Sequence, residues 1–331
     1  MNDKILIVGP SWVGDMMMAQ VLFQLLRQQK PEAELHVLAP AWSQALLSRM
    51  PEIQKSIVLP FLHGQLKLQE RYRFAKTLQS EQYSLAIVIP NSFKSALIPY
   101  WAGIPKRRGW LGEYRFGLLN DIRLLNKKNF PLMVQRMSGL AYDLLSRMPA
   151  NLPVPKLVVQ KESTDVTLQK YNLKIDKPIL ALCPGAEFGP SKCWPAKHYA
   201  AVANQKISDG FSVWILGSPN DCAIAKDIQL RTQNRCENLV GKTNLSEAVD
   251  LLSLVNSVVT NDSGLMHIAA ALDRSVIAIY GSTSPDFTPP LSEKAKIVTL
   301  NLSCQPCFKR QCPLKHHHCM EQLLPEKVLQ E

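Results

Sequence analysis

Short apolar runs alternate with helix-length amphipathic stretches along the first half of the chain. Each run expected to be a strand is followed by a stretch with helical periodicity: Lys4–Val8 then Met16–Gln29, Glu34–Leu38 then Trp42–Met50, and Leu85–Ile89 then Phe93–Trp101. Alternation of this kind is typical of a parallel sheet with helices on both faces. We therefore predict an α/β domain with a doubly wound, Rossmann-like sheet.

The second half of the chain shows the same alternation of expected strands and helices. Its expected strands are Pro178–Cys183, Ser212–Leu216, Ser257–Thr260 and Ser275–Tyr280, separated by helical stretches such as Ala196–Gln205 and Ser246–Leu254. The proline-rich stretch "PANLPVPKL" after Met148 breaks any helix and stiffens a connection. We predict two domains, 1–152 and 153–331, facing across a cleft at which the carboxyl ends of both sets of strands form a ligand site.

Length and composition fit this picture. The 331 residues are enough for two domains, and 46% hydrophobic with 20% charged residues is typical of a soluble globular protein. No stretch has the form of a signal peptide or a membrane span, so we expect a cytoplasmic protein. The net charge of +11 favours anionic partners: nucleic acid, anionic lipid or phosphorylated ligands.

The stretch "GPSWVGDMMMAQ" joins the first expected strand to the first expected helix and carries Asp15. A carboxylate at a helix start can cap it by accepting unpaired backbone N–H groups. Facing a cleft, it can instead serve as a general base, with Gly9 and Gly14 letting a substrate approach the backbone. The spacing matches neither a Walker loop nor a dinucleotide-binding fingerprint.

A second strand-to-helix junction is "VVTNDSGLMHIAAAL", residues 258–272. The amides at the helix start, together with Ser263 and Gly264, suit an anion such as phosphate. Asp262 would repel phosphate, so it is expected to cap amides or bind hydroxyls, and His267 lies one turn into the helix. A plain cap and a core histidine explain the same residues.

A third junction, "LCPGAEFGPSKCWP", follows the first strand of the second half and places Lys192 near its end. A lysine at the carboxyl edge of a sheet can offer a point charge to a phosphate, although most surface lysines have no such role.

Four cysteines cluster near the C-terminus as Cys304-x2-Cys307-x4-Cys312-x6-Cys319, beside His316, His317 and His318. Thiolates and imidazoles at short spacing can surround zinc, but the spacing is irregular for a structural zinc site. Reduced cysteines and a local disulfide are the alternatives, and any metal here would be structural. The scattered Cys183, Cys193, Cys222 and Cys236 are expected to be reduced.

Residues 91–136 hold nine lysines and arginines against one glutamate and one aspartate, with tryptophan and tyrosine interleaved. Such a segment suits nucleic acid or a phosphorylated glycolipid at a membrane surface, and it can also be an ordinary solvated face. No RNA-binding signature accompanies it.

Five stretches together, in this order, resemble the bacterial heptosyltransferases of lipopolysaccharide core synthesis. They span nearly the whole chain: "GPSWVGDMMMAQ", "PGAEFGPSKCWP", "NDSGLMHIAAAL", "YGSTSPDFTPP" and "CQPCFKRQCPLKHHHCM". The Ser-Trp-Val-Gly-Asp form of the first favours the branch that adds the second inner-core heptose over the branch that adds the first.

This resemblance implies an inverting, metal-independent glycosyltransferase of the GT-B fold, without a cofactor. It would move L-glycero-D-manno-heptose from ADP-heptose, held by residues 153–331, to the first heptose of heptosyl-Kdo-lipid A, held by residues 1–152. The chain has no Asp-x-Asp pair to hold a divalent ion on the pyrophosphate, which fits. The acceptor implies a peripheral position at the cytoplasmic face of the inner membrane and no nucleic-acid partner.

We expect Asp15 to act as general base and Lys192 to stabilise the leaving pyrophosphate. The residues expected to bind the donor are Gly185, Ser191, Asp262, Ser263, Gly264, His267, Ser282 and Thr283. Those expected to bind the acceptor are Trp12, Gly14, Asn91, Lys94, Arg107 and Arg108. The alternatives are a first- or third-heptose transferase and, more distantly, a nucleotide-dependent oxidoreductase or an RNA-binding protein.

Overall fold

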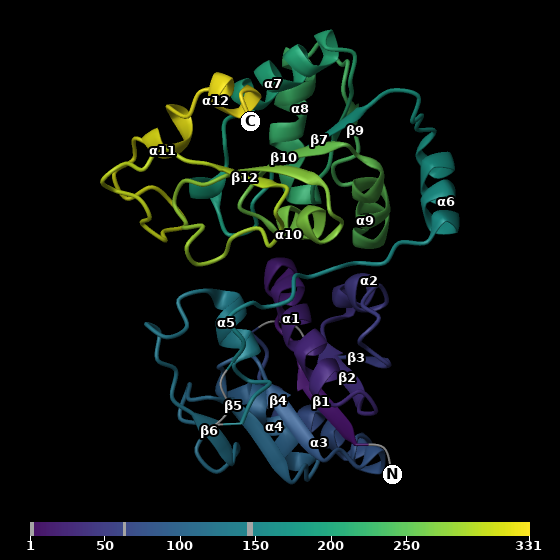
Figure 1. The fold of residues 1–331 in the computed structure, drawn as a ribbon, viewed down its shortest axis with the longest axis vertical. Coiled ribbons are helices and arrows are strands. Elements are labelled where there is room, and N and C mark those ends of the chain that lie inside the picture. Colours follow the sequence, from purple (N-terminus) through teal and green to yellow (C-terminus); the bar gives the residue numbers. More distant parts are fainter. Residues whose placement is uncertain (1–2, 62–63, 144–147) are drawn as a thin grey trace. The chain divides into compact units, whose positions relative to one another are not determined.

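The chain is described by a computed structural model that covers residues 3–61, 64–143 and 148–331. It divides into two compact units, Met1–Pro155 and Lys156–Glu331, so the division falls within the proline-rich stretch. Each unit is an α/β layer structure around one six-stranded parallel sheet (Figure 1). Among the described helices, none combines the length and the apolar character that a membrane span requires.

Unit 1 contains a sheet with the strand order β3-β2-β1-β4-β5-β6. Its strands are β1 Lys4–Val8, β2 Glu34–Ala39, β3 Lys55–Val58, β4 Leu85–Val88, β5 Lys106–Trp110 and β6 Asp121–Arg123. Its helices are α1 Val13–Gln29, α2 Gln44–Leu47, α3 Leu68–Thr77, α4 Phe93–Trp101 and α5 Met133–Ser138. Helices α3 and α4 pack on the sheet face that carries Leu6 and Val8, and α1 packs against α5.

Unit 2 repeats this plan with the strand order β12-β11-β10-β7-β8-β9. Its strands are β7 Ile179–Cys183, β8 Ser212–Ile215, β9 Glu237–Asn238, β10 Ser257–Asn261, β11 Ser275–Ile279 and β12 Ala295–Val298. Its helices are α6 Lys161–Tyr171, α7 Ala196–Ser208, α8 Cys222–Arg231, α9 Leu245–Leu254, α10 Gly264–Ala271, α11 His318–Glu321 and α12 Pro325–Leu329. One core joins one face of this sheet to α7, α8, α11 and α12.

In each sheet the chain order reverses between two central strands. The reversal lies between β1 and β4 in unit 1 and between β7 and β10 in unit 2. Both pairs run parallel, so the loops that follow these strands leave the same edge of their sheet. Open α/β sheets bind ligands at this switch point, outside the carboxyl ends of the strands. The fold therefore selects the turn into α1, which carries Asp15, and the loop after β7, which carries Lys192.

The structure contains the strands and helices that were predicted from apolar, periodic stretches of the sequence. Helix α4 has the bounds expected for it, Phe93–Trp101, whereas the helix expected over Trp42–Met50 is reduced to α2 after a short 3₁₀ turn. Strand β5 was not predicted, because its sequence KRRGW contains no apolar run. It forms because Arg108 is buried and its charge is met by Asp121 on β6, a contact between strands that periodicity does not reveal.

Candidate active site

Three neighbouring strands of unit 2 bring together Lys192, Asp262 and Thr283. Lys192 ends a short 3₁₀ helix in the loop after β7, while Asp262 directly follows β10 and Thr283 lies in the loop after β11. The Lys192 Nζ lies 2.6 Å from Asp262 Oδ2, and the Thr283 hydroxyl donates to the same oxygen at 2.6 Å. Only 13% of the Lys192 side chain and 5% of the Asp262 side chain are exposed. The carboxylate thus holds a shielded lysine at the switch point.

Asn261, the last residue of β10, fastens both ends of the Lys192 loop. Its fully buried amide donates to the Pro184 carbonyl at 2.6 Å and accepts from the Trp194 N–H at 3.1 Å. The Tyr199 hydroxyl donates to the same Asn261 oxygen at 3.0 Å. Sequence reasoning assigned Asn261 no role, although its place at the end of a strand beside Asp262 was the available signal.

Gly185 lies at the start of the same loop and is required by packing. A Cβ atom at this position would lie 2.2 Å from a carboxylate oxygen of Asp221. That carboxylate accepts hydrogen bonds from the Ser218 N–H and hydroxyl, so it is held in place. The loops after β7 and β8 can approach this closely only because residue 185 has no side chain.

Helix α10 begins at Gly264, with Ser263 in extended conformation before it. The Ser263 hydroxyl lies 3.2 Å from the Thr260 hydroxyl, and the first amides of the helix face the loop side of the sheet. Burial lowers the pKa of His267 to about 4, against a smaller opposing effect of Asp262. The imidazole is therefore neutral at pH 7, where it can form hydrogen bonds but adds no positive charge.

Ser191 and Ser282 lie together, but inside the protein. Both are about 1% exposed, and their hydroxyls are 2.9 Å apart. The Ser191 hydroxyl also donates to the Lys309 carbonyl, and the Phe308 N–H donates to the Ser282 carbonyl at 2.7 Å. These hydroxyls were expected to face the donor; they instead fasten the C-terminal segment to the Lys192 loop, a packing that local sequence does not reveal.

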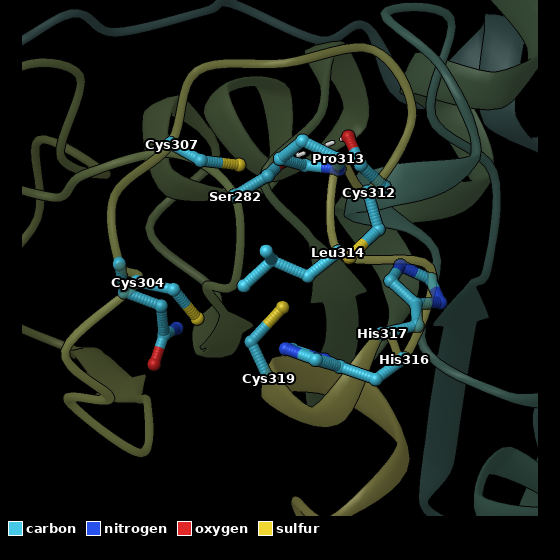
Figure 2. Close-up of a pocket in the computed structure, with 11 residues that line it drawn as sticks. Ser282, Cys304, Cys307, Cys312, Pro313, Leu314, His316, His317 and Cys319 are labelled. Atoms are coloured by element: carbon cyan, nitrogen blue, oxygen red, sulfur yellow. Dashed lines mark hydrogen bonds between the residues drawn. The ribbon is translucent and has the colours of Figure 1, made fainter.

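The clustered cysteines line one pocket of unit 2. Figure 2 shows the side chains of Cys304, Cys307, Cys312 and Cys319 around that of Leu314, with His316 and His317 beside them. All eight cysteines are free thiols, so the structure has no local disulfide in this segment. Among the described residues, no three histidine, cysteine or carboxylate side chains are arranged to hold a metal ion as they stand.

The corresponding edge of unit 1 carries Asp15. Helix α1 begins at Val13 with Trp12 in the N-cap position, so Asp15 lies in the first turn of the helix and is not its N-cap. Gly14 belongs to the same turn, and 46% of Trp12 is exposed. Gly9 lies against Met16 and Ala39, which lets the chain turn closely from β1 into α1. Asp15 is partly exposed beside the switch point.

Asn91 and Lys94 follow β4 and share this edge, but Arg107 and Arg108 do not. Both arginines lie within β5, where they pair in register with Ala86 and Ile87 rather than with the end of β4. Arg108 is buried and donates to Asp121 at 2.7 Å, while Arg107 donates to the Leu118 carbonyl at 2.6 Å. The structure thus separates these two expected acceptor contacts from Asp15.

The basic segment is not a uniform basic surface. Arg115 and Arg123 are buried as well as Arg108, and burial lowers the pKa of Arg115 to about 10. Arg115 donates to the Pro90 carbonyl, and Arg123 donates to the Gly139 carbonyl. These arginines bind backbone carbonyls in turns of unit 1, which none of the three sequence interpretations foresaw. Lys127 and Lys128 are exposed.

The chain is similar to known proteins both in sequence and in structure. The sequence profile described as "Glycosyltransferase family 9 (heptosyltransferase)" matches residues 71–318. The chain is 46% identical to lipopolysaccharide heptosyltransferase 2 of Escherichia coli (strain K12), over 99% of this chain and 97% of that protein. It is 50% identical to lipooligosaccharide heptosyltransferase 2 of Haemophilus influenzae, over 90% of this chain and 88% of that protein. The solved structure of E. coli ADP-heptose lps heptosyltransferase II superposes with a TM-score of 0.89 at 44% identity, over 99% of this chain and 96% of that one.

Proposed function

Because the chain belongs to glycosyltransferase family 9, the heptosyltransferases, we propose that it moves heptose from ADP-heptose to the first heptose of the lipopolysaccharide inner core. The observation that carries the proposal is 46% identity across nearly the full length to heptosyltransferase 2. The two doubly wound units are those of the GT-B fold, as the family resemblance implied.

Asp15 is the proposed general base. The acceptor hydroxyl attacks the anomeric carbon of the donor from the side opposite ADP, so the C–O bond to ADP breaks and the configuration inverts. Asp15 takes up the hydroxyl proton as the new bond forms. A positioned carboxylate typically accelerates such a step by about 10²–10⁴-fold. Its place in the first turn of α1, at the switch point of unit 1, supports this role.

Lys192 is the proposed partner of the leaving pyrophosphate. Its ammonium is already oriented by Asp262, and the Thr283 hydroxyl and the first amides of α10 lie on the same sheet edge. Oriented cations and helix starts stabilise developing negative charge without the cost of reorganisation, so no divalent ion is needed at this step. Asp262 acts by positioning Lys192 rather than by contacting phosphate.

The segment 111–128 is the proposed contact with the anionic membrane surface that holds the acceptor. It exposes Tyr114 and Phe116 to 87% and 63%, and Leu124 to 77%. The exposed Lys127 and Lys128 follow directly. Apolar side chains that enter the headgroup region, next to lysines that attract anionic lipids, are typical of peripheral membrane contacts.

The test is ADP release from ADP-heptose in the presence of Kdo-lipid A that carries either no heptose or one. Turnover is expected with the acceptor that carries one heptose and not with the other. Preference for the heptose-free acceptor would contradict the proposal and assign the chain to the first transfer. Adding EDTA during the assay should leave the initial rate unchanged, and a rate that collapses at once would contradict the metal-free mechanism.

A further inference from the structure

Four cysteines of the C-terminal segment line the same pocket, and the proposed reaction uses none of them. From this arrangement we propose that Cys304, Cys307, Cys312 and Cys319 bind one thiophilic divalent ion of the zinc class. The ion would be structural and would hold the segment 304–319 against the loop that carries Lys192. Four thiolates around one ion form the tetrahedral coordination that zinc prefers in structural sites.

The electrostatics of the segment suit such a centre. Four thiolates and one divalent ion carry a net charge of minus two, which needs nearby positive charge. Residues 301–320 include Lys309, Arg310 and Lys315 and contain no aspartate or glutamate.

Binding requires side-chain rotation, because the thiols do not now converge on one point. Leu314 occupies the space between them in Figure 2. Its side chain is 58% exposed, so it can leave the pocket at small cost in buried apolar surface. Cysteine has one side-chain torsion with three staggered positions, so its sulfur can be redirected without a change in the backbone.

The pocket is joined directly to the Lys192 loop. Ser191 and Ser282 line it, and they directly precede Lys192 and Thr283 in the chain. The Ser191 N–H donates to the Arg310 carbonyl, and Gly189 lies so close to Arg310 that a Cβ there would be 2.7 Å from its carbonyl oxygen. An ion that rigidifies the segment 304–319 would therefore also hold Lys192 in place.

The test is the metal content of the full-length protein, purified under reducing conditions and reconstituted with Zn²⁺. Mass spectrometry of the metal should find about one equivalent per chain, as for a closed structural site. A mercurial reagent should release that metal in step with the titration of the clustered thiols. Less than about a tenth of an equivalent after reconstitution, or a disulfide within the cluster, would overturn the proposal.

Single substitutions identify the ligands. Cys307→Ser and Cys312→Ser should each weaken metal binding by at least tenfold. Cys222→Ser is the matched control, because Cys222 is an exposed free thiol of the same unit outside the pocket. If Cys222→Ser loses the metal and the cluster variants keep it, the assignment is wrong. Replacement by Co²⁺ in the wild type gives a sulfur-to-metal absorption band, which tests thiolate ligation without any variant that has to fold.

The link to the donor site is measured by ADP binding, not by transfer. Metal-free protein should bind ADP at least about fivefold more weakly, with recovery when Zn²⁺ is restored. If the metal-free protein binds ADP as tightly as the metal-bound protein, the metal does not hold Lys192 in place. Metal content and cobalt absorption require neither donor nor acceptor, so a failure of the proposed transfer reaction would leave these results interpretable.

Discussion

The two sheets share one strand order, yet the loops at their switch points are built differently. In unit 2, buried polar contacts join neighbouring loops: Lys192 to Asp262, and Asn261 to Pro184. In unit 1, the same position presents Asp15 in the first turn of a helix beside the exposed Trp12. Topology therefore decides where a site forms, while burial decides whether its side chains form a shielded cradle or an accessible edge.

The difference agrees with the two tasks proposed for them. A leaving pyrophosphate is best stabilised by groups that are held in place before the reaction. An acceptor that arrives at a membrane surface needs an open edge with a base within reach of its hydroxyl.

Replacing Asp15 by asparagine should lower turnover by at least about a hundredfold, because an amide cannot accept the proton. Affinity for ADP-heptose should stay within a few-fold, since the donor is assigned to unit 2. The assay is ADP release together with calorimetric donor binding. Glu70→Gln is the matched control, because Glu70 is an exposed acid in the first turn of α3. Turnover within a few-fold of wild type would reduce Asp15 to a structural role.

Replacing Lys192 by alanine should lower turnover by about 10²–10³-fold, as for loss of one preorganised charge partner. It should also destabilise unit 2, because Asp262 is then buried without its cation. Adding Asp262→Asn to this variant should restore the melting temperature without restoring turnover. Recovery of turnover in the double variant would show that Lys192 only neutralises Asp262.

The stability of unit 2 should fall in acid because of His267. Its pKa is about 4 in the folded protein, below the ordinary value of 6.5, so the unfolded chain binds the proton more readily. The contribution of His267 to the free energy of unfolding is complete above pH 6.5. It is lost as the pH falls toward 4, and the loss is about 3 kcal/mol. Urea unfolding at pH 7 and pH 4.5 measures it. A His267→Gln variant with the same pH dependence as wild type would contradict the assignment.

Replacing Asn261 by alanine should cost about 1–3 kcal/mol, because the Pro184 carbonyl and the Trp194 N–H lose their buried partner. The Michaelis constant for the donor should also rise, since the Lys192 loop is released. Asn256 precedes β10 and accepts from the Ile179 N–H at the opposite end of the strand. Asn256→Ala should leave donor kinetics unchanged; an equal rise there would refute a specific role for Asn261.

The smallest effect is expected in the segment 111–128, the proposed contact with the membrane surface. Replacing Lys127 and Lys128 by glutamine should weaken binding to anionic vesicles by about 1 kcal/mol per lysine at low salt. Added salt should abolish the difference between variant and wild type. Sedimentation with phosphatidylglycerol vesicles measures it, and neutral phosphatidylcholine vesicles are the control. Binding that is unaffected by both substitutions and by salt would exclude this segment as the contact.

Much of the molecule followed from the sequence alone. The apolar runs and their periodicity predicted the central strands β1, β4, β7 and β10, and with them the switch-point loops of both units. This succeeded because strand and helix patterns are local and because parallel sheets bury nearly continuous apolar runs. The same local reading placed Asp15 and Lys192 at the carboxyl edges of their sheets.

Only the tertiary structure decided how polar groups are used. The partner of Lys192 lies 70 residues away in the chain, and Asp121 allows Arg108 to be buried within a strand that has no apolar run. Ser191 and Ser282 likewise fasten the C-terminal segment instead of facing outward. A charge or hydroxyl is stable in the interior only when its partner is already there, and that partner comes from another part of the chain.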